Sequence, residues 1–168
     1  MSTERELRCY DYVNQPYAAV HGLLRADTRG LLARATSVAA ARAEAVTAKL
    51  ELRLGPVAIA TEVDVDVTSV EETVSPLRTP ATRFGIDWRA RRGQSLFPVM
   101  HASLTVYALS GHETQVVFSG QYEPPLGPVG AAIDALVGHH IAEACALRFV
   151  QEVAAELRHE LAAGARCA

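Results

Sequence analysis

Lysine is nearly absent from this chain of 168 residues, whose 16 basic residues are fifteen arginines and the single Lys49. Schiff-base chemistry, or the lysine of a phosphate-binding loop, would therefore have to use Lys49. This residue lies in a strand-like pattern, and no glycine-rich loop is next to it. The sequence thus argues against both kinds of chemistry.

Cysteine is scarce as well. The three cysteines, Cys9, Cys145 and Cys167, form no CxxC pair and have no metal-ligand spacing. An odd number of cysteines without such spacing is typical of a protein whose thiols stay reduced, so we expect a cytoplasmic protein without disulfides. Cys145 falls in an apolar helical pattern, and we expect it to be a buried, unreactive thiol.

Long apolar runs and a strong excess of one charge are also missing. No run of eighteen apolar residues occurs, and the opening stretch MSTEREL is charged, so we expect neither a secretion signal nor stable membrane insertion. The net charge is −3 and the pI about 6.1, which gives no reason to expect nucleic acid as a partner. With 49% apolar and 21% charged residues, the composition is ordinary for a globular domain.

What the sequence does contain is a clear change of hydrophobic period. Residues 5–13 are typical of a first strand, and Asn14-Gln15-Pro16 predicts a helix start with Pro16 at the first helical position. Asp27 then predicts the start of a second short helix. Between residues 47 and 122 apolar and polar residues alternate, which predicts half-buried strands joined by short turns and therefore antiparallel.

The alternation ends at GQYEPPLGPVG, residues 120–130, where prolines stop strand pairing and pre-set a helix start. From Pro128 to about Leu161 apolar residues recur every three or four positions, which predicts one helix roughly 50 Å long. The apolar face of such a sheet must be buried against another element, and this helix is the one predicted element large enough to bury it.

We therefore predict an α+β fold with a curved antiparallel sheet of six or seven strands. The sheet wraps around the long C-terminal helix, and two short helices follow the first strand. Residues 1–161 are expected to form a single domain, and residues 162–168 a flexible tail.

This order of elements, together with three stretches, resembles the helix-grip proteins of the START-like (SRPBCC) superfamily. The stretches are YVNQPYAAVHGLL (12–24), FGIDWRARRGQSLFPVMHASLTV (84–106) and FSGQYEPPLGPVGAAIDALVGHHIAEACALRFVQEVAAEL (118–157). The superfamily includes lipid-transfer domains, plant allergens and polyketide cyclases, and the chain is most similar to its uncharacterised bacterial polyketide cyclase/dehydrase-like branch. The resemblance implies a cavity between sheet and helix, and it transfers no catalytic residue.

Two polar patterns invite a metal-site hypothesis and are better explained as solvent-facing. His139 and Glu143 would share a helical face beside His140, but two ligands do not make a metal site. The alternating acidic residues of 62–66 would lie on the outer face of a strand, opposite valines. We therefore expect no metal and no other cofactor.

The apolar face of the strands and of the long helix defines the predicted ligand-binding surface. It offers no acid, base or nucleophile, and its polar handles are Tyr122, the Trp88 indole and Cys145. The direction of Tyr10 and Tyr12 stays open, because their parity is opposite to that of Cys9. The predicted lining residues are Leu52, Val63, Val65, Phe84, Ile86, Trp88, Met100, Leu104, Val116, Phe118, Tyr122, Ile133, Val137, Ile141, Cys145 and Phe149.

Three functions of different classes remain at this point. The first is the binding or transport of an apolar small molecule, such as a lipid, an isoprenoid or a polyketide-like compound. The second is a polyketide cyclase, aromatase or dehydratase, which requires acid/base groups inside the cavity. The third is a protein-interaction module that uses the outer sheet face around a filled core. A homodimer is compatible with all three, and nothing in the sequence indicates one.

Overall fold

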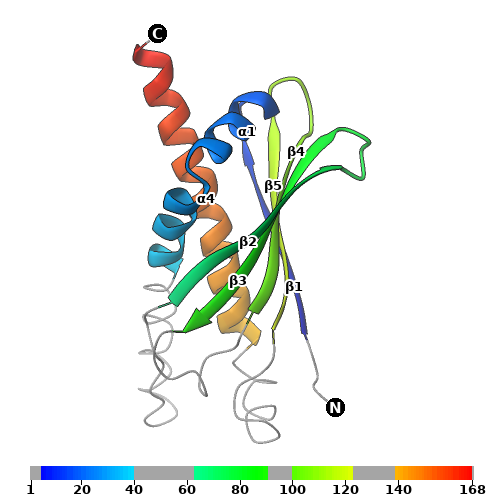
Figure 1. The fold of residues 1–168 in the computed structure, drawn as a ribbon, viewed down its shortest axis with the longest axis vertical. Helices are drawn as coiled ribbons and strands as arrows, with labels where there is room; N and C mark the ends of the chain where they lie inside the picture. Colours follow the sequence, from blue (N-terminus) through cyan, green and yellow to red (C-terminus); the bar gives the residue numbers. More distant parts are fainter. Residues whose placement is uncertain (1–4, 40–62, 91–99, 123–138, 168) are drawn as a thin grey trace, which may run out of the picture.

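The computed structural model describes residues 5–39, 63–90, 100–122 and 139–167. In chain order the elements are β1 (Arg5–Val13), α1 (Tyr17–Ala26), a helix over residues 28–39, β2 (Val63–Val74), β3 (Pro80–Ala90), β4 (Met100–Ala108), β5 (Thr114–Tyr122) and α4 (His139–Cys167). The strands form one antiparallel sheet in the order β1-β5-β4-β3-β2. The sheet is twisted, and α4 runs along one of its faces (Figure 1). The predicted α+β helix-grip arrangement is confirmed.

Hydrogen bonds mark the starts of the two short helices. The backbone N–H groups of Ala19 and Val20 donate to the Pro16 carbonyl, at 3.0 and 3.2 Å, so Pro16 immediately precedes the first helical residue instead of being that residue. In the next helix the Gly30 N–H donates to Asp27 Oδ1 at 3.0 Å, which satisfies one of the free donors at the helix start. The predicted restart of the helix at Asp27 is therefore confirmed.

A β-bulge in β2 changes which residues face the helices. The pairing of β2 with β3 shifts between Val67 and Ser69, so that Val67 pairs with Ile86 but Val70 pairs with Phe84. The alternation in β2 is thereby reversed after Thr68. Gly85 lies opposite the bulge, where a Cβ would come within 2.6 Å of the hydroxyl oxygens of Thr68 and Ser69. A side chain at this position would have to displace these two hydroxyl groups.

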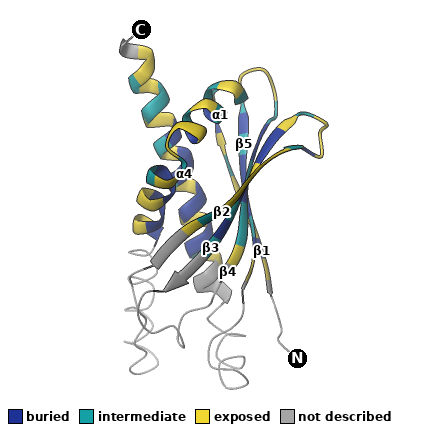
Figure 2. Cartoon of the chain, in the orientation of Figure 1, coloured by how far each residue is buried: buried dark blue, intermediate teal, exposed yellow. Residues whose placement is uncertain are grey.

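The core lies between the sheet and the helices, as the buried residues in Figure 2 show. Six apolar residues on the helix-facing side of β3, β4 and β5 are at most 1% exposed: Phe84, Ile86, Leu104, Val106, Val116 and Phe118. They meet the apolar face of α4, two residues of α1 and four of the helix over 28–39. The buried helical residues are Val20, Leu24, Leu31, Leu32, Ala35, Ala39, Ala146, Phe149, Val150, Val153, Ala154 and Leu157.

Two details of the prediction need correction. The described part of the chain has five strands where six or seven were predicted, and the predicted strand at 47–54 lies outside the described residues. The long helix continues to Cys167, six residues beyond the predicted end at Leu161, so residues 162–167 are helical. The apolar period marks the length of helix that packs on the sheet, whereas alanine in 162–167 favours helix without needing a partner. Residues 128–138, where the helix start was predicted, lie outside the described residues.

Candidate functional site

Cross-strand rows organise the helix-facing side of the sheet. We call one the Phe84 row: Phe84, Leu104, Phe118 and Cys9 are paired in succession across β3, β4, β5 and β1. Two residues further along, Ile86, Ala102, Gly120 and Leu7 are paired in the same way and form the Ala102 row. The two rows differ in side-chain size, and this difference defines the candidate site.

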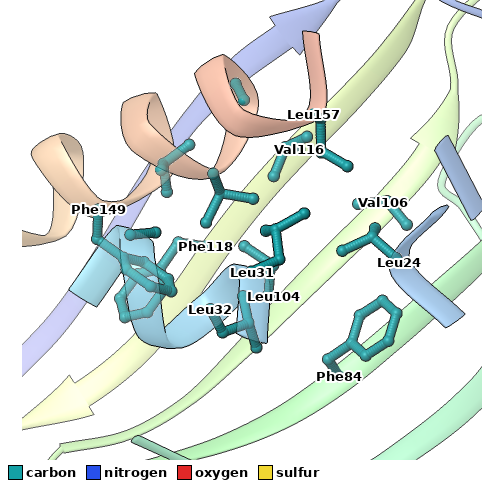
Figure 3. Close-up of a cluster of buried hydrophobic side chains, with 14 of the residues drawn as sticks. Leu24, Leu31, Leu32, Phe84, Leu104, Val106, Val116, Phe118, Phe149 and Leu157 are labelled. Atoms are coloured by element: carbon teal, nitrogen blue, oxygen red, sulfur yellow. The ribbon is translucent and has the colours of Figure 1, made fainter. Parts of the chain in front are cut away.

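The Phe84 row is tightly packed against the helices (Figure 3). The Phe118 and Phe149 rings meet edge to face, with centroids 5.7 Å apart and planes at 73°. Phe84, Leu104 and both of these phenylalanines are 0% exposed. Leu24, Leu31 and Leu32 complete the packing from the short helices. This end of the core is filled by the protein's own side chains.

The centre of the Ala102 row is lined by small groups. Ala102 and Gly120 sit on the inner strands β4 and β5, and a Cβ at Gly120 would come within 2.9 Å of the Ala102 Cβ. One helical turn before Phe149, toward the start of α4, the buried residues are Cys145 and Ala146, which are also small. Ala102 is only partly buried, although it lies on a central strand and faces the helices. Side-chain volume therefore falls sharply from the Phe84 row to the Ala102 row.

The thiol next to this row is not a nucleophile. Burial, reinforced by the nearby Glu143 carboxylate, raises the pKa of Cys9 to about 12. The thiol therefore stays protonated at neutral pH, and the thiolate is the reactive form. Cys145 is buried, as predicted, with 8% of its surface exposed.

The predicted lining residues divide into two groups. Seven have described side chains and all seven are buried: Phe84, Ile86, Leu104, Val116, Phe118, Cys145 and Phe149. Leu52, Ile133 and Val137 lie outside the described residues, as do the side chains of Val63, Val65, Trp88, Met100, Tyr122 and Ile141. The backbone register still aligns four of these, because Val65 pairs with Trp88, Trp88 with Met100 and Met100 with Tyr122. This further row adjoins the Ala102 row.

Sequence reasoning missed a polar cluster at the opposite end of the same face. Thr82 is 0% exposed and is paired with Glu72 across β3 and β2. Its hydroxyl lies 2.6 Å from the Tyr17 hydroxyl and donates to Glu72 Oε2 at 2.9 Å. His21 Nε2 and Arg25 Nη1 each lie 3.0 Å from Glu72 Oε1. The prediction that no acid or base lies on this face was therefore wrong.

The bulge determines which glutamate of β2 faces the helices. Without it, the parity of Val63, Val65 and Val67 places Glu71 on the helix-facing side and Glu72 outside, and the shift after Val67 reverses this. No residue pattern in β2 marks the shift, although Gly85 in the partner strand is a signal that a bulge lies nearby.

This polar cluster joins α1 to the sheet. The oxygens of its one carboxylate, Glu72, already have hydrogen-bond partners within the protein. The hydrogen bond with His21, followed by those from Thr82 and Arg25, holds the pKa of Glu72 below its usual range. Burial raises the pKa of Tyr17. A carboxylate that accepts hydrogen bonds from three partners and has a lowered pKa is a poor general base at neutral pH. We therefore interpret the cluster as an ion-paired clamp on α1.

Other polar predictions have the following outcomes. Among the residues that the structure describes, no group of three histidine, cysteine, aspartate or glutamate side chains could hold a metal ion. Glu143 is exposed, and the side chains of His139 and His140 lie outside the described residues. Tyr10 and Tyr12 point to the outer face, with 54% and 37% of their surfaces exposed.

No helix within the described ranges combines the length and apolar character needed to cross a membrane.

No protein-family model and no curated protein sequence matches the chain. Solved structures with a similar arrangement include the Zhui aromatase/cyclase from Streptomyces sp. R1128, at 13% identity and a TM-score of 0.48, covering 94% of this chain and 96% of that one. Ara h 8.0201 matches at 8% identity and a TM-score of 0.37, covering 88% and 99%. Norcoclaurine synthase from Thalictrum flavum, solved with dopamine and hydroxybenzaldehyde, matches at 10% identity and a TM-score of 0.38, covering 90% and 87%. All three are helix-grip proteins of the SRPBCC/Bet v 1-like kind. The likeness concerns the fold alone, and no site residue is transferred from it.

Proposed function

We propose that the protein binds an apolar small molecule over the Ala102 row, between the sheet and the first turns of α4. The observation that carries this proposal is the fall in side-chain volume from the Phe84 row to the Ala102 row, two adjoining rows of apolar residues on the helix-facing side of the sheet. The ligand class is a lipid, an isoprenoid or a polyketide-like compound, because the side chains of Ile86, Ala102 and Leu7 in this row, and of Cys145 and Ala146 on α4, carry no charge.

Apolar burial would supply the affinity. A ligand that removes about 200 Å² of its surface from water would gain about 5 kcal/mol, before the cost of immobilising it is subtracted. The filled Phe84 row would close one end of the site. The neighbouring row of Trp88, Met100 and Tyr122 would border the other end, where the Trp88 indole N–H and the Tyr122 hydroxyl are the expected partners for a polar group of the ligand.

A cyclase-type enzyme remains the alternative and requires an acid or base beside the bound ligand. Two features of the described residues support binding over catalysis. The Cys9 thiol, next to the site, has a pKa of about 12. The Glu72 carboxylate, two rows beyond the Ala102 row, is occupied by His21, Arg25 and Thr82. Neither group is suited to move a proton at the ligand near neutral pH.

Titration with an apolar fluorescent probe tests the proposal. Ala102→Leu adds three carbon atoms to the row and should weaken probe binding by roughly tenfold or more. Thr105→Val, on the same strand but the opposite face, should leave binding within about twofold. Equal affinities for both variants, at unchanged thermal stability, would show that the probe binds elsewhere. Turnover of a polyketide-like substrate that is lost on removing a single ionisable residue would favour the enzyme instead.

A further inference from the structure

The outer face of the sheet carries a hollow, on the side opposite the side chains that pack against the helices. It has a volume of about 450 Å³ and is open to solvent. Its polar lining comes chiefly from Glu6, Asp87, His101, Ser103, Ser119 and Gln121. Along β4 and β5, His101, Ser103, Ser119 and Gln121 alternate with residues that face the helices, so they lie on the outer face. Thr68, Ile86, Ala102 and Gly120 complete the lining, so the hollow shares three residues with the Ala102 row, although the Ile86 and Ala102 side chains face the helices.

Cross-strand register explains why the face is hollowed here. Asp87, His101, Gln121 and Glu6 are paired in succession across four strands and form one polar row. In the adjacent row Gly85 pairs with Ser103, and Ser103 pairs with Ser119. Three small residues side by side leave a depression beside the taller polar row. Gly85 lies opposite the β2 bulge, and Thr68 of the bulge also lines the hollow.

One polar pair in the hollow is held in a defined orientation. His101 Nδ1 lies 2.8 Å from Asp87 Oδ1, and the Asp87 side chain is 21% exposed while that of His101 is 70% exposed. Because Nδ1 faces the carboxylate, Nε2 on the far side of the ring is available to a ligand. The imidazole is thus oriented before any ligand arrives.

We infer that this hollow binds a hydroxyl-rich small molecule without negative charge, of the sugar or amino-sugar class. Hydroxyls of Ser103 and Ser119, the Gln121 amide, the His101 ring and the carboxylates of Asp87 and Glu6 offer donors and acceptors in turn, as a polyol requires. The two carboxylates disfavour an anion, and an apolar ligand would leave the polar lining unsatisfied. The volume falls within the range of about 300–1,000 Å³ that small-molecule sites occupy.

Backbone amide NMR of the full chain, titrated with glucose, glucosamine and glucuronate, tests the inference. Glucose should cause saturable shifts in the amides of 101–103 and 119–121, and glucosamine should bind at least as tightly. Glucuronate should bind several-fold more weakly, because Asp87 and Glu6 repel its carboxylate. Tighter binding of glucuronate, or shifts that grow linearly with all three compounds, would overturn the inference.

Variants separate this site from the apolar one. Gln121→Ala and His101→Ala should each weaken glucosamine binding by about tenfold, as the loss of a hydrogen-bonding group predicts. Ser119→Leu should fill the hollow and abolish sugar binding, while leaving the apolar probe titration unchanged. Thr105→Val, one row away on the same face, is the matched control and should bind as the unmodified chain does. Sugar binding that survives Ser119→Leu, or that falls equally in Thr105→Val, would contradict the assignment.

Discussion

Phe149 offers the sharpest test of how α4 is seated on the sheet. The residue is 0% exposed, and its ring meets Phe118 at 5.7 Å in an edge-to-face contact. Phe149→Ala should remove about 3–5 kcal/mol of unfolding free energy, since it deletes a fully buried ring and leaves a cavity. Phe149→Leu and Phe118→Leu, combined in a double-mutant cycle, should show a coupling of about 0.5–1.5 kcal/mol for the aromatic pair.

Urea unfolding followed by circular dichroism measures these losses. With an m-value of about 2 kcal/mol/M, Phe149→Ala should lower the midpoint by about 2 M. Leu147→Ala is the matched control on the same helix, because Leu147 is 43% exposed, and it should cost less than about 1 kcal/mol. Similar midpoints for the two alanine variants would refute the helix orientation. A coupling near zero in the cycle would refute the ring contact.

Three further predictions follow from particular residues. Leu104→Asp should prevent folding or lower the melting temperature severely, because it buries an unpaired charge, whereas Ser103→Asp on the outer face should lower it only slightly. Gly85→Ala should destabilise the chain by about 1–3 kcal/mol in chemical unfolding through contact with the Ser69 hydroxyl, and adding Ser69→Ala should recover part of the loss. Since the pKa of Glu72 is lowered in the fold, its stabilising contribution is present above the unfolded pKa and is lost as pH falls through the folded value. Glu72→Gln should therefore flatten the acid side of the stability curve below about pH 5, and an unchanged curve would show that the clamp on α1 contributes nothing.

Much of the fold was predictable because hydrophobic period is a local property. In β3 and β4 apolar and polar residues alternate around Phe84 and Leu104, and in β5 the same alternation is broken by Val117 alone. The predicted inward residues of these strands whose side chains are described are buried. The same holds for α4, where Phe149 and its neighbours at three- and four-residue spacing face the sheet. In these elements one face is buried, so apolar residues recur with a period of two in the strands and about 3.6 in the helix.

The remaining features depend on contacts that no single segment encodes. The position of Glu72 follows from a pairing shift between two strands, so the sequence of β2 alone gives the wrong face. The direction of Tyr10 and Tyr12 could not be predicted, because β1 has apolar or aromatic side chains on both faces. In the structure Leu7 and Val13 are buried against the helices, and the two tyrosines are on the exposed outer face. Ala102 and Gly120 were not predicted as site residues, because a search for apolar lining looks for large side chains, whereas the proposed site is defined by small ones.

Native mass spectrometry of the freshly purified protein tests the central proposal most directly. The account predicts a mass excess from a bound apolar molecule that organic extraction releases, and a markedly lower occupancy in Ala102→Leu than in the matched outer-face control Thr105→Val. A protein that shows no mass excess and binds no apolar probe, or one whose ligand occupancy is the same in both variants, would contradict it.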